Sequence, residues 1–108
     1  MPENLQVCLV FCTHPKKDAA QDLARKIVQN KLAACVQILE KGTSFYEWEG
    51  NIEESAEFLM VMKSFLSQFD SLKEFIIQNH PYDVPEIIAV NIEAISENYL
   101  QWMSGVLK

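Results

Sequence analysis

The chain has 108 residues, of which 49% are hydrophobic and 22% charged, and this composition excludes an intrinsically disordered protein. Its formal net charge is −6 and Arg25 is its only arginine. It therefore lacks the clustered basic residues with which proteins bind nucleic acids or anionic membranes. The length predicts one domain over residues 1–108.

The N-terminal sequence and the cysteines favour a cytosolic protein. Residues 1–4 lack the basic segment of a signal peptide, and the apolar run 7–12 is too short to span a membrane. The three cysteines, Cys8, Cys12 and Cys35, cannot all pair, and strand geometry holds Cys8 and Cys12 too far apart for a disulfide. We therefore expect free thiols in a reducing cytosol.

Hydrophobic periodicity and turn residues predict the element order β-α-β-β-α-β-α. In chain order we expect a strand at 5–13, a helix at 16–30, a strand at 32–39, hairpin arms at about 35–49 and 52–64, a helix at 65–79, a strand at 86–92 and a helix at 97–107. Gly42 and Gly50-Asn51 punctuate the hairpin, Pro81 stops the second helix, and Ser96 can cap the last one.

This order contains two successive β-α-β halves, which is the split βαβ, or ferredoxin-like, pattern of an α+β fold. Right-handed crossovers would place the first two helices on the same face of a four-stranded sheet. A face exposed to water should alternate apolar and polar residues, but the runs 7–12, 58–62 and 87–90 are apolar on both faces. We expect another copy of the chain to cover the second face. The alternative is a monomer whose terminal helix wraps over it.

Residues 80–92 combine a stiff backbone with polar side chains. Pro81 and Pro85 fix their own φ angles and favour extended geometry in the residues before them. The segment also carries His80, Tyr82, Asp83 and Glu86, and an apolar strand follows at once. It therefore marks either a positioned site or a junction between subunits.

Cys12 and His80 are the candidate metal ligands. Cys12 stands at the carboxyl end of the first strand and His80 precedes the last strand, two ends that ferredoxin-like pairing would need to bring together. A thiol with an imidazole favours copper or zinc over magnesium or calcium. The alternative is that Cys12 is a small hydrophobic residue of the core. The same pair lacks any local signature of a nucleophile and its base, so we do not expect an enzyme.

The long hairpin is a second candidate region, because its tip is aromatic and acidic. Tyr46 and Trp48 would either line a ligand pocket or pack against a neighbouring subunit. Lys63 ends the return arm and is expected to extend its ammonium group into solvent. The glycines are isolated and form no phosphate-binding loop.

Several segments in this order resemble one family, the CutA1 divalent-cation tolerance proteins. The matching segments are 11–13 with Pro15, 31–36, 44–54, 58–63, 80–90 and 99–102. The most specific part is His-Pro-Tyr-x-x-Pro-Glu at 80–86, preceded along the chain by Lys-Leu-Ala-Ala-Cys at 31–35.

The resemblance implies a ferredoxin-like fold assembled as a tight homotrimer whose hairpins reach onto neighbouring subunits. It also implies copper binding, with Cys12 and His80 at the positions proposed as ligands. Some members carry a second histidine where this chain has Asn79, and many carry a small residue or proline where it has His14. The family also resembles PII signalling proteins in architecture, which raises a regulatory small-molecule site between subunits.

The leading expectation is therefore a cytosolic homotrimer that binds copper or another divalent cation weakly and needs no organic cofactor. One alternative is a PII-like or small-molecule-binding module with clefts between subunits, for which the candidate residues are Trp48, Lys63, Tyr82 and Glu86. The other is a purely structural or interaction trimer. Neither nucleic acid nor membrane is an expected partner.

Overall fold

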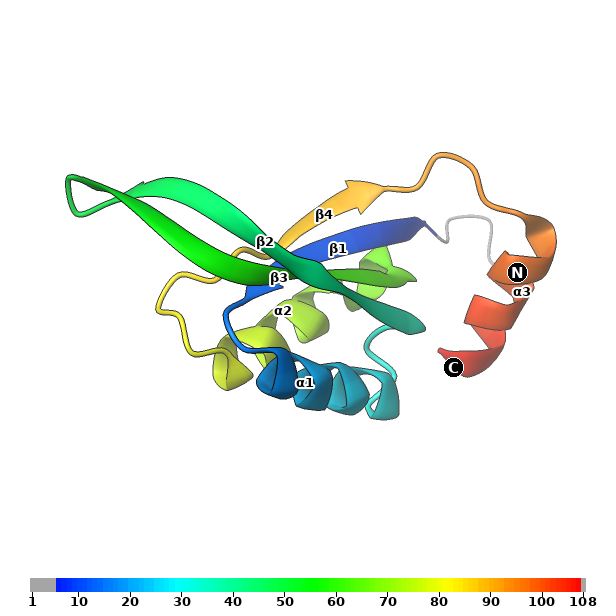
Figure 1. Ribbon diagram of the computed structural model, residues 1–108. Helices are drawn as coiled ribbons and strands as arrows, with labels where there is room; N and C mark the ends of the chain where they lie inside the picture. Colours follow the sequence, from blue (N-terminus) through cyan, green and yellow to red (C-terminus); the bar gives the residue numbers. More distant parts are fainter. Residues whose placement is uncertain (1–5, 108) are drawn as a thin grey trace.

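The computed structural model describes residues 6–107, and Figure 1 shows their arrangement. The elements in chain order are β1 (Val7–His14), α1 (Lys17–Gln29), β2 (Cys35–Trp48), β3 (Asn51–Phe65), a 3-10 turn (Leu66–Gln68), α2 (Phe69–Asn79), β4 (Ile88–Asn91) and α3 (Glu97–Val106). The expected order of strands and helices is confirmed. Leu5, with which the first strand was expected to begin, lies outside the described residues.

The four strands form one antiparallel sheet in the order β2-β3-β1-β4. This is the order of the split βαβ pattern, in which each crossover skips one strand. Both crossover helices, α1 and α2, lie on the same face of the sheet, as right-handed connections require (Figure 1). The predicted α+β fold is therefore confirmed at the level of a single chain.

The second strand begins later than predicted, because the chain reverses after α1 before it enters the sheet. Lys31 adopts a left-handed φ of 59°, its N–H bonds the Val28 carbonyl, and the Leu32 N–H bonds the Ile27 carbonyl. This pattern is a Schellman motif, which terminates a helix and reverses the chain. Residues 32–34 are consequently part of the connection, and β2 starts at Cys35.

The hairpin turn is shifted by one residue from its predicted place. Glu49 and Gly50 have φ angles of 50° and 84°, and Trp48 pairs with Asn51. Two left-handed residues make the tight turn whose twist suits a hairpin. Asn51 therefore belongs to β3. Nearer the start of β2, a register shift between Ile38 and Lys41 bends the two long arms.

Two other predicted boundaries were wrong by a few residues. Phe65 ends β3 and does not begin α2, because its backbone is extended and the 3-10 turn follows it. β4 begins at Ile88, since residues 85–87 still belong to the proline-stiffened connector. The predicted cap of α3 is confirmed, because the Ser96 hydroxyl accepts a hydrogen bond from the Tyr99 N–H at 3.3 Å.

The main core lies between the sheet and the two crossover helices. One face of β1 and β3 buries Cys8, Val10, Cys12, Met60 and Met62 completely. These residues pack with Ala20, Leu23 and Ile27 of α1 and with Leu72 and Ile76 of α2. Cys12 is therefore a core residue in the single chain, whatever further role it has.

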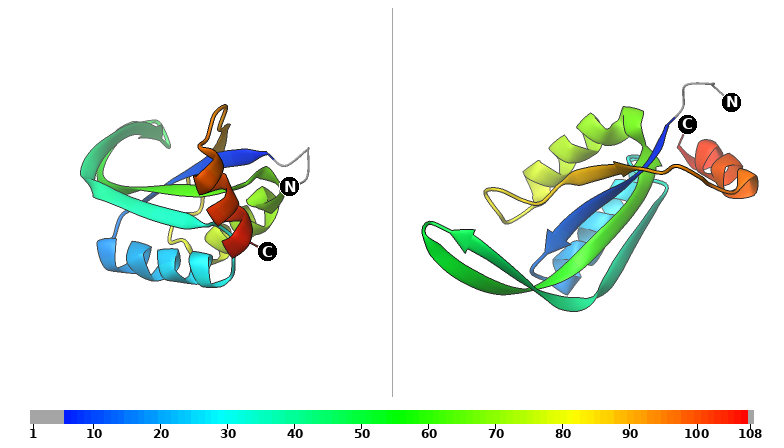
Figure 2. Two further views of the ribbon diagram at one scale, coloured as in Figure 1. Left: turned by 90° about the vertical axis from the view of Figure 1, so that its right-hand side faces the viewer. Right: turned by 90° about the horizontal axis from the view of Figure 1, so that it is seen from above.

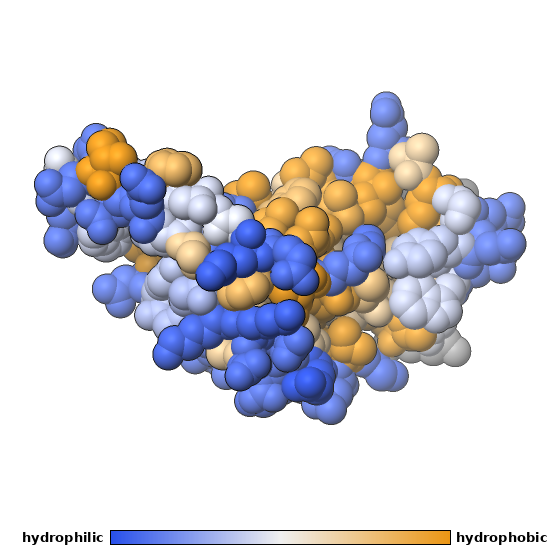
Figure 3. Space-filling model, in the orientation of Figure 1, coloured by the Kyte–Doolittle hydropathy of each residue, from blue (hydrophilic) through white to orange (hydrophobic). Residues whose placement is uncertain are grey.

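The opposite face of the sheet carries apolar side chains that no described helix covers. Strand register places Leu9, Phe11 and Val61 on this face, together with Ile88 and Val90, which remain 52% and 48% exposed. Figure 2 shows α1 and α2 behind the sheet in the view from above, and Figure 3 shows apolar surface gathered over the sheet. We call these five residues the open face.

Helix α3 does not cover the open face. Met103 and Leu107 pack instead against Val7, Ala34 and Phe65 at one end of the sheet. Figures 1 and 2 show the helix beyond the end of the strands. Within the described residues, the terminal helix therefore does not wrap over the sheet, as the monomer alternative would require.

Candidate functional site

His80 is held between the end of α2 and the end of β1. Its backbone is extended (φ −107°, ψ 142°), as expected of a residue before proline. Its Nδ1 lies 3.1 Å from the Tyr82 backbone N–H and accepts that hydrogen, which leaves the ring proton on Nε2. Nε2 in turn donates to the Thr13 carbonyl oxygen at 2.7 Å. Both ring nitrogens are thus engaged by backbone atoms.

Cys12 donates its thiol hydrogen to the same Thr13 carbonyl oxygen, with sulfur and oxygen 3.5 Å apart. The sulfur and the His80 Nε2 are therefore separated by no more than the sum of their two distances to that oxygen. Burial, followed by the charges of Glu86 and Glu57, raises the pKa of the Cys12 thiol to about 12. The side chain is consequently a protonated thiol at neutral pH.

His14 lies beside His80 and is almost completely buried. The two ring centroids are 4.8 Å apart, with the planes tilted by 53°. Its Nδ1 accepts a hydrogen bond from the Lys16 N–H at 3.1 Å. Burial and the neighbouring His80 lower the pKa of His14, although the Glu57 charge opposes this. His14 is thus held in its neutral form.

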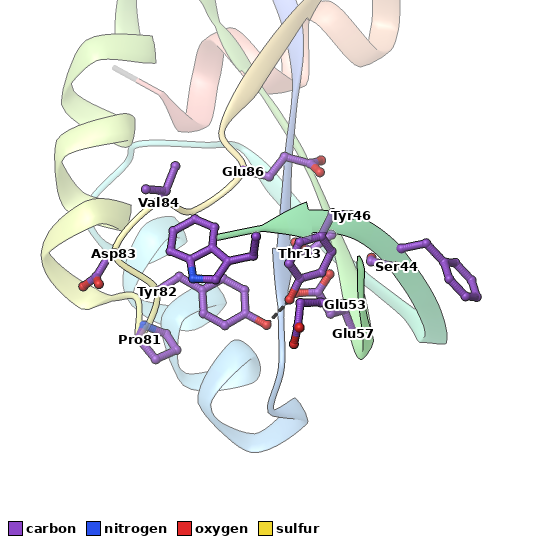
Figure 4. A pocket seen from close by; sticks show the side chains of 12 residues that line it. Thr13, Ser44, Tyr46, Glu53, Glu57, Pro81, Tyr82, Asp83, Val84 and Glu86 are labelled. Atoms are coloured by element: carbon purple, nitrogen blue, oxygen red, sulfur yellow. Dashed lines mark hydrogen bonds between the residues drawn. The ribbon is translucent and has the colours of Figure 1, made fainter. Parts of the chain in front are cut away.

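Tyr82 continues this group of side chains toward β3. Its ring centroid lies 4.9 Å from that of His80, and its hydroxyl donates to the Glu57 Oε2 at 2.6 Å. Burial, the hydrogen bond to Glu57 and the Glu57 charge all raise the pKa of Tyr82. The phenol stays protonated and fixes the connector to the buried carboxylate, as Figure 4 shows.

A cleft of about 670 Å³ opens between the hairpin and the connector. It is lined by Thr13, Ser44, Phe45, Tyr46, Trp48, Glu53, Glu57, Pro81, Tyr82, Asp83, Val84 and Glu86. Three of the four cleft candidates named from the sequence, Trp48, Tyr82 and Glu86, lie here within one chain. The fourth, Lys63, lies elsewhere on β3, where its ammonium group donates to the Gln37 side chain.

Glu57 is the site residue that sequence reasoning missed. It is 7% exposed although it lies in the middle of β3, directly before the apolar run 58–62, where a carboxylate would be expected to reach solvent. The only sequence signal was its place directly before the run 58–62. Its burial depends on Tyr82, which is distant in sequence, so no local pattern could have revealed it.

The described residues hold no preformed metal centre. Within residues 6–107, no group of three or more His, Cys, Asp or Glu side chains is close enough to hold an ion. Cys12, His14 and His80 are neighbours, but their hydrogen bonds point to backbone atoms. In the same residues, no helix is long and apolar enough to cross a membrane.

Comparison with known proteins gives consistent matches. The family model described as CutA1 divalent ion tolerance protein matches residues 8–106. Protein CutA, chloroplastic, of Arabidopsis thaliana is 44% identical over 97 residues, which cover 90% of this chain and 53% of that protein. The divalent-cation tolerance protein CutA of Escherichia coli is 36% identical over 105 residues, covering 97% and 94%. The chain thus spans about half the length of the Arabidopsis protein.

Solved structures match equally well. CutA1 from Oryza sativa superposes with a TM-score of 0.93 at 39% identity, covering 96% of this chain and 95% of that one. The periplasmic divalent cation tolerance protein CutA from Archaeoglobus fulgidus superposes with a TM-score of 0.91 at 31% identity, covering 94% and 99%. The name of the Archaeoglobus fulgidus protein describes tolerance of divalent cations and not an enzymatic activity.

Proposed function

The chain belongs to the family of CutA1 divalent ion tolerance proteins, and from this membership we propose that it is a cytosolic homotrimer that binds copper, or another divalent cation, weakly through Cys12 and His80. The ion is cargo in this proposal and takes part in no reaction. The expectations of no enzymatic activity and no organic cofactor stay predictions.

One observation carries the proposal: the Cys12 thiol and the His80 imidazole converge on the Thr13 carbonyl oxygen. A soft sulfur and an imidazole nitrogen at one place are ligands that suit copper or zinc. The charges of Glu57 and Glu86, which act on the thiol, also attract a cation to this end of β1.

The same geometry supports weak binding. Metal ligands must be deprotonated, and a thiol with a pKa of about 12 gives up its proton only at a cost in affinity. His80 must also exchange its bond to Thr13 for the ion, while the Tyr82 N–H keeps Nδ1 as an acceptor. The donor set fits a soft ion only after these local bonds rearrange.

The open face supports assembly. An apolar sheet surface that lacks a cover within one chain is typical of an interface between copies. The number three comes from the family resemblance. The three free thiols support a reducing compartment, which favours the cytosol.

The alternatives have less support. A cleft for a small anion does not suit the lining described above, because its charged side chains are all carboxylates and Lys63 is elsewhere. In a purely structural trimer, the meeting of Cys12 and His80 would serve only the stability of the fold.

Calorimetric titration with copper, carried out anaerobically with cuprous ion and in air with cupric ion, tests the proposal. We expect wild type to bind copper, and the double variant Cys12→Ala, His80→Ala to lose that binding. The matched control is the double variant Cys35→Ala, Asn79→Ala. It removes the third thiol and the side chain next to His80, and it should leave copper binding unchanged. Equal stoichiometry and affinity in wild type and the first variant would exclude these ligands.

A further inference from the structure

His80 belongs to a short backbone motif that occurs twice in this chain. In His14-Pro15-Lys16 and in His80-Pro81-Tyr82, the N–H of the third residue donates to the Nδ1 of the histidine, at 3.1 Å in both cases. Because each Nδ1 accepts a hydrogen, each ring in its neutral form carries its own proton on Nε2. The backbone of the motif thus selects one tautomer of each ring.

The two motifs place their rings side by side at the end of β1, and the ring of His80 also meets Cys12. The centroids of the His14 and His80 rings lie 4.8 Å apart. The Nε2 of His80 and the Sγ of Cys12 both donate to the Thr13 carbonyl oxygen, at 2.7 and 3.5 Å. The Nδ1 of His80 is engaged by Tyr82 instead. A metal ion shared with Cys12 therefore reaches Nε2 and not Nδ1.

Binding at Nε2 changes the hydrogen bonding of the other ring nitrogen. The ion replaces the proton on Nε2, and a neutral imidazole keeps one proton, which then stands on Nδ1. The ring as a whole neither gains nor loses a proton. Nδ1 has become a donor, and the Tyr82 N–H that faces it at 3.1 Å is a donor as well. The two groups no longer bond, and the part-buried N–H loses this partner.

The connector between α2 and β4 is the part of the structure that can respond to this loss. Residues 80–87 form neither helix nor strand, and Pro81, Asp83 and Val84 are exposed. The ring of His80, by contrast, packs against His14 of β1. The proline rings fix two φ angles of the connector, so we expect it to shift as a unit.

A second bond holds the connector in its metal-free position. The Tyr82 hydroxyl donates to Glu57 of β3 at 2.6 Å (Figure 4). Tyr82 is therefore tied at two points, through its N–H and through its hydroxyl. By thermodynamic linkage, a bond that stabilises the metal-free position of the connector weakens metal binding by the same free energy.

We propose that Tyr82 is a positioning residue of the metal site: its N–H bond to His80 and metal binding at His80 exclude each other, so the connector moves when the ion binds. This inference rests on the proposed function and adds a response to it. Tyr82 and Glu57 both line the cleft against the hairpin, so the movement alters that wall. In the proposed homotrimer, whose hairpins reach onto neighbouring subunits, the junction between subunits thereby registers the ion.

Nuclear magnetic resonance of ¹⁵N-labelled protein, titrated anaerobically with cuprous ion, tests the proposal. This ion is diamagnetic, so the spectrum stays observable. Long-range correlations should place the His80 proton on Nε2 without metal and on Nδ1 with metal. The Tyr82 amide should then exchange with solvent about tenfold faster. The matched control in the same spectra is the Lys16 amide, which makes the same bond to His14 and should exchange as before.

Tyr82→Phe tests the second tie of the connector by calorimetry with cuprous ion. The variant keeps the N–H and removes the hydroxyl bond to Glu57, so it should bind the ion about threefold to tenfold more tightly than wild type. A residue that only supported the site would give weaker binding when truncated. The control is Tyr99→Phe, which removes a hydroxyl from α3, where its partner is Cys35, and should bind as wild type does.

The outcomes separate this inference from the function on which it rests. No copper binding, or binding that His80→Ala does not weaken, would overturn both. Copper binding through His80 with the proton still on Nε2, or with the Tyr82 amide still protected, would overturn this inference alone. So would weaker binding by a folded Tyr82→Phe protein. Equal acceleration at the Lys16 amide would indicate general loosening of this end of β1 and would contradict a response of the connector.

Discussion

Cys12 and His80 direct their side chains at one atom, the carbonyl oxygen of Thr13, although they are far apart in the sequence. The thiol comes from the helix-covered face of β1, and the imidazole arrives from the connector after α2. The shared acceptor holds the connector against the end of β1. It therefore explains why a core cysteine lies beside a histidine.

His80→Ala should destabilise the protein, because the change removes both bonds of the ring, to Thr13 and to the Tyr82 N–H. We expect a loss of about 1–3 kcal/mol in the free energy of unfolding, measured by denaturant titration at fixed protein concentration. Asn79→Ala is the control, since within residues 6–107 its exposed side chain bonds only the Phe75 carbonyl. Equal losses in the two variants would show that the ring bonds contribute nothing specific.

Cys12 should resist alkylation in the native protein. It is fully buried and its pKa is raised to about 12, so thiolate, the reactive form, is scarce at pH 8 or so. Mass spectrometry after iodoacetamide treatment should find Cys12 unmodified in buffer and modified in denaturant. Rapid native modification would indicate that this end of β1 opens readily.

Stability should fall as the pH drops below about 6.5, the ordinary pKa of histidine. The folded protein lowers the pKa of His14 through burial and the neighbouring His80, so the unfolded chain binds that proton more readily. Stability from this residue is therefore complete above the unfolded pKa and is lost as the pH falls through it toward the folded pKa.

Thermal unfolding from about pH 7.5 to about pH 5 measures this effect. His14→Asn, which keeps an acceptor near the Lys16 N–H, should show a flatter profile than wild type. Parallel profiles would assign the pH dependence to other groups.

Tyr82→Phe should cost about 1–3 kcal/mol of stability, because it leaves the buried Glu57 carboxylate without its donor. Adding Glu57→Gln should recover part of this loss, since a neutral amide is less costly to leave unpaired. A double-mutant cycle of the two substitutions measures the coupling. Strict additivity would mean that the short hydrogen bond carries no coupling energy.

Val61→Glu should prevent assembly, because it places a charge in the middle of the open face, opposite Phe11 and Gln37 in the register. Sedimentation velocity should give a trimer for wild type and a smaller species for the variant. Ile77→Glu introduces the same charge at a 46% exposed position on α2 and should leave the trimer intact. A trimeric Val61→Glu protein would show that the interface lies elsewhere.

Local chemistry made most of the fold readable in advance. Apolar spacing predicted α1, Ser96 predicted the cap of α3, and glycine with apolar flanks predicted the hairpin. The errors were at element boundaries, which depend on the backbone conformation of single residues. Lys31 is an example: its left-handed conformation ends α1, and the sequence does not signal it because lysine rarely adopts that conformation.

By itself the sequence determined the order of the elements, the two-sided apolar strands and the family to which the chain belongs, because these depend on patterns between near neighbours in the chain. Only the tertiary structure decided that Cys12 and His80 share the Thr13 oxygen, that Glu57 is buried beneath Tyr82, and that α3 leaves the open face bare. These contacts join residues distant in sequence, and they depend on strand order and on the path of the connector, which no local pattern encodes.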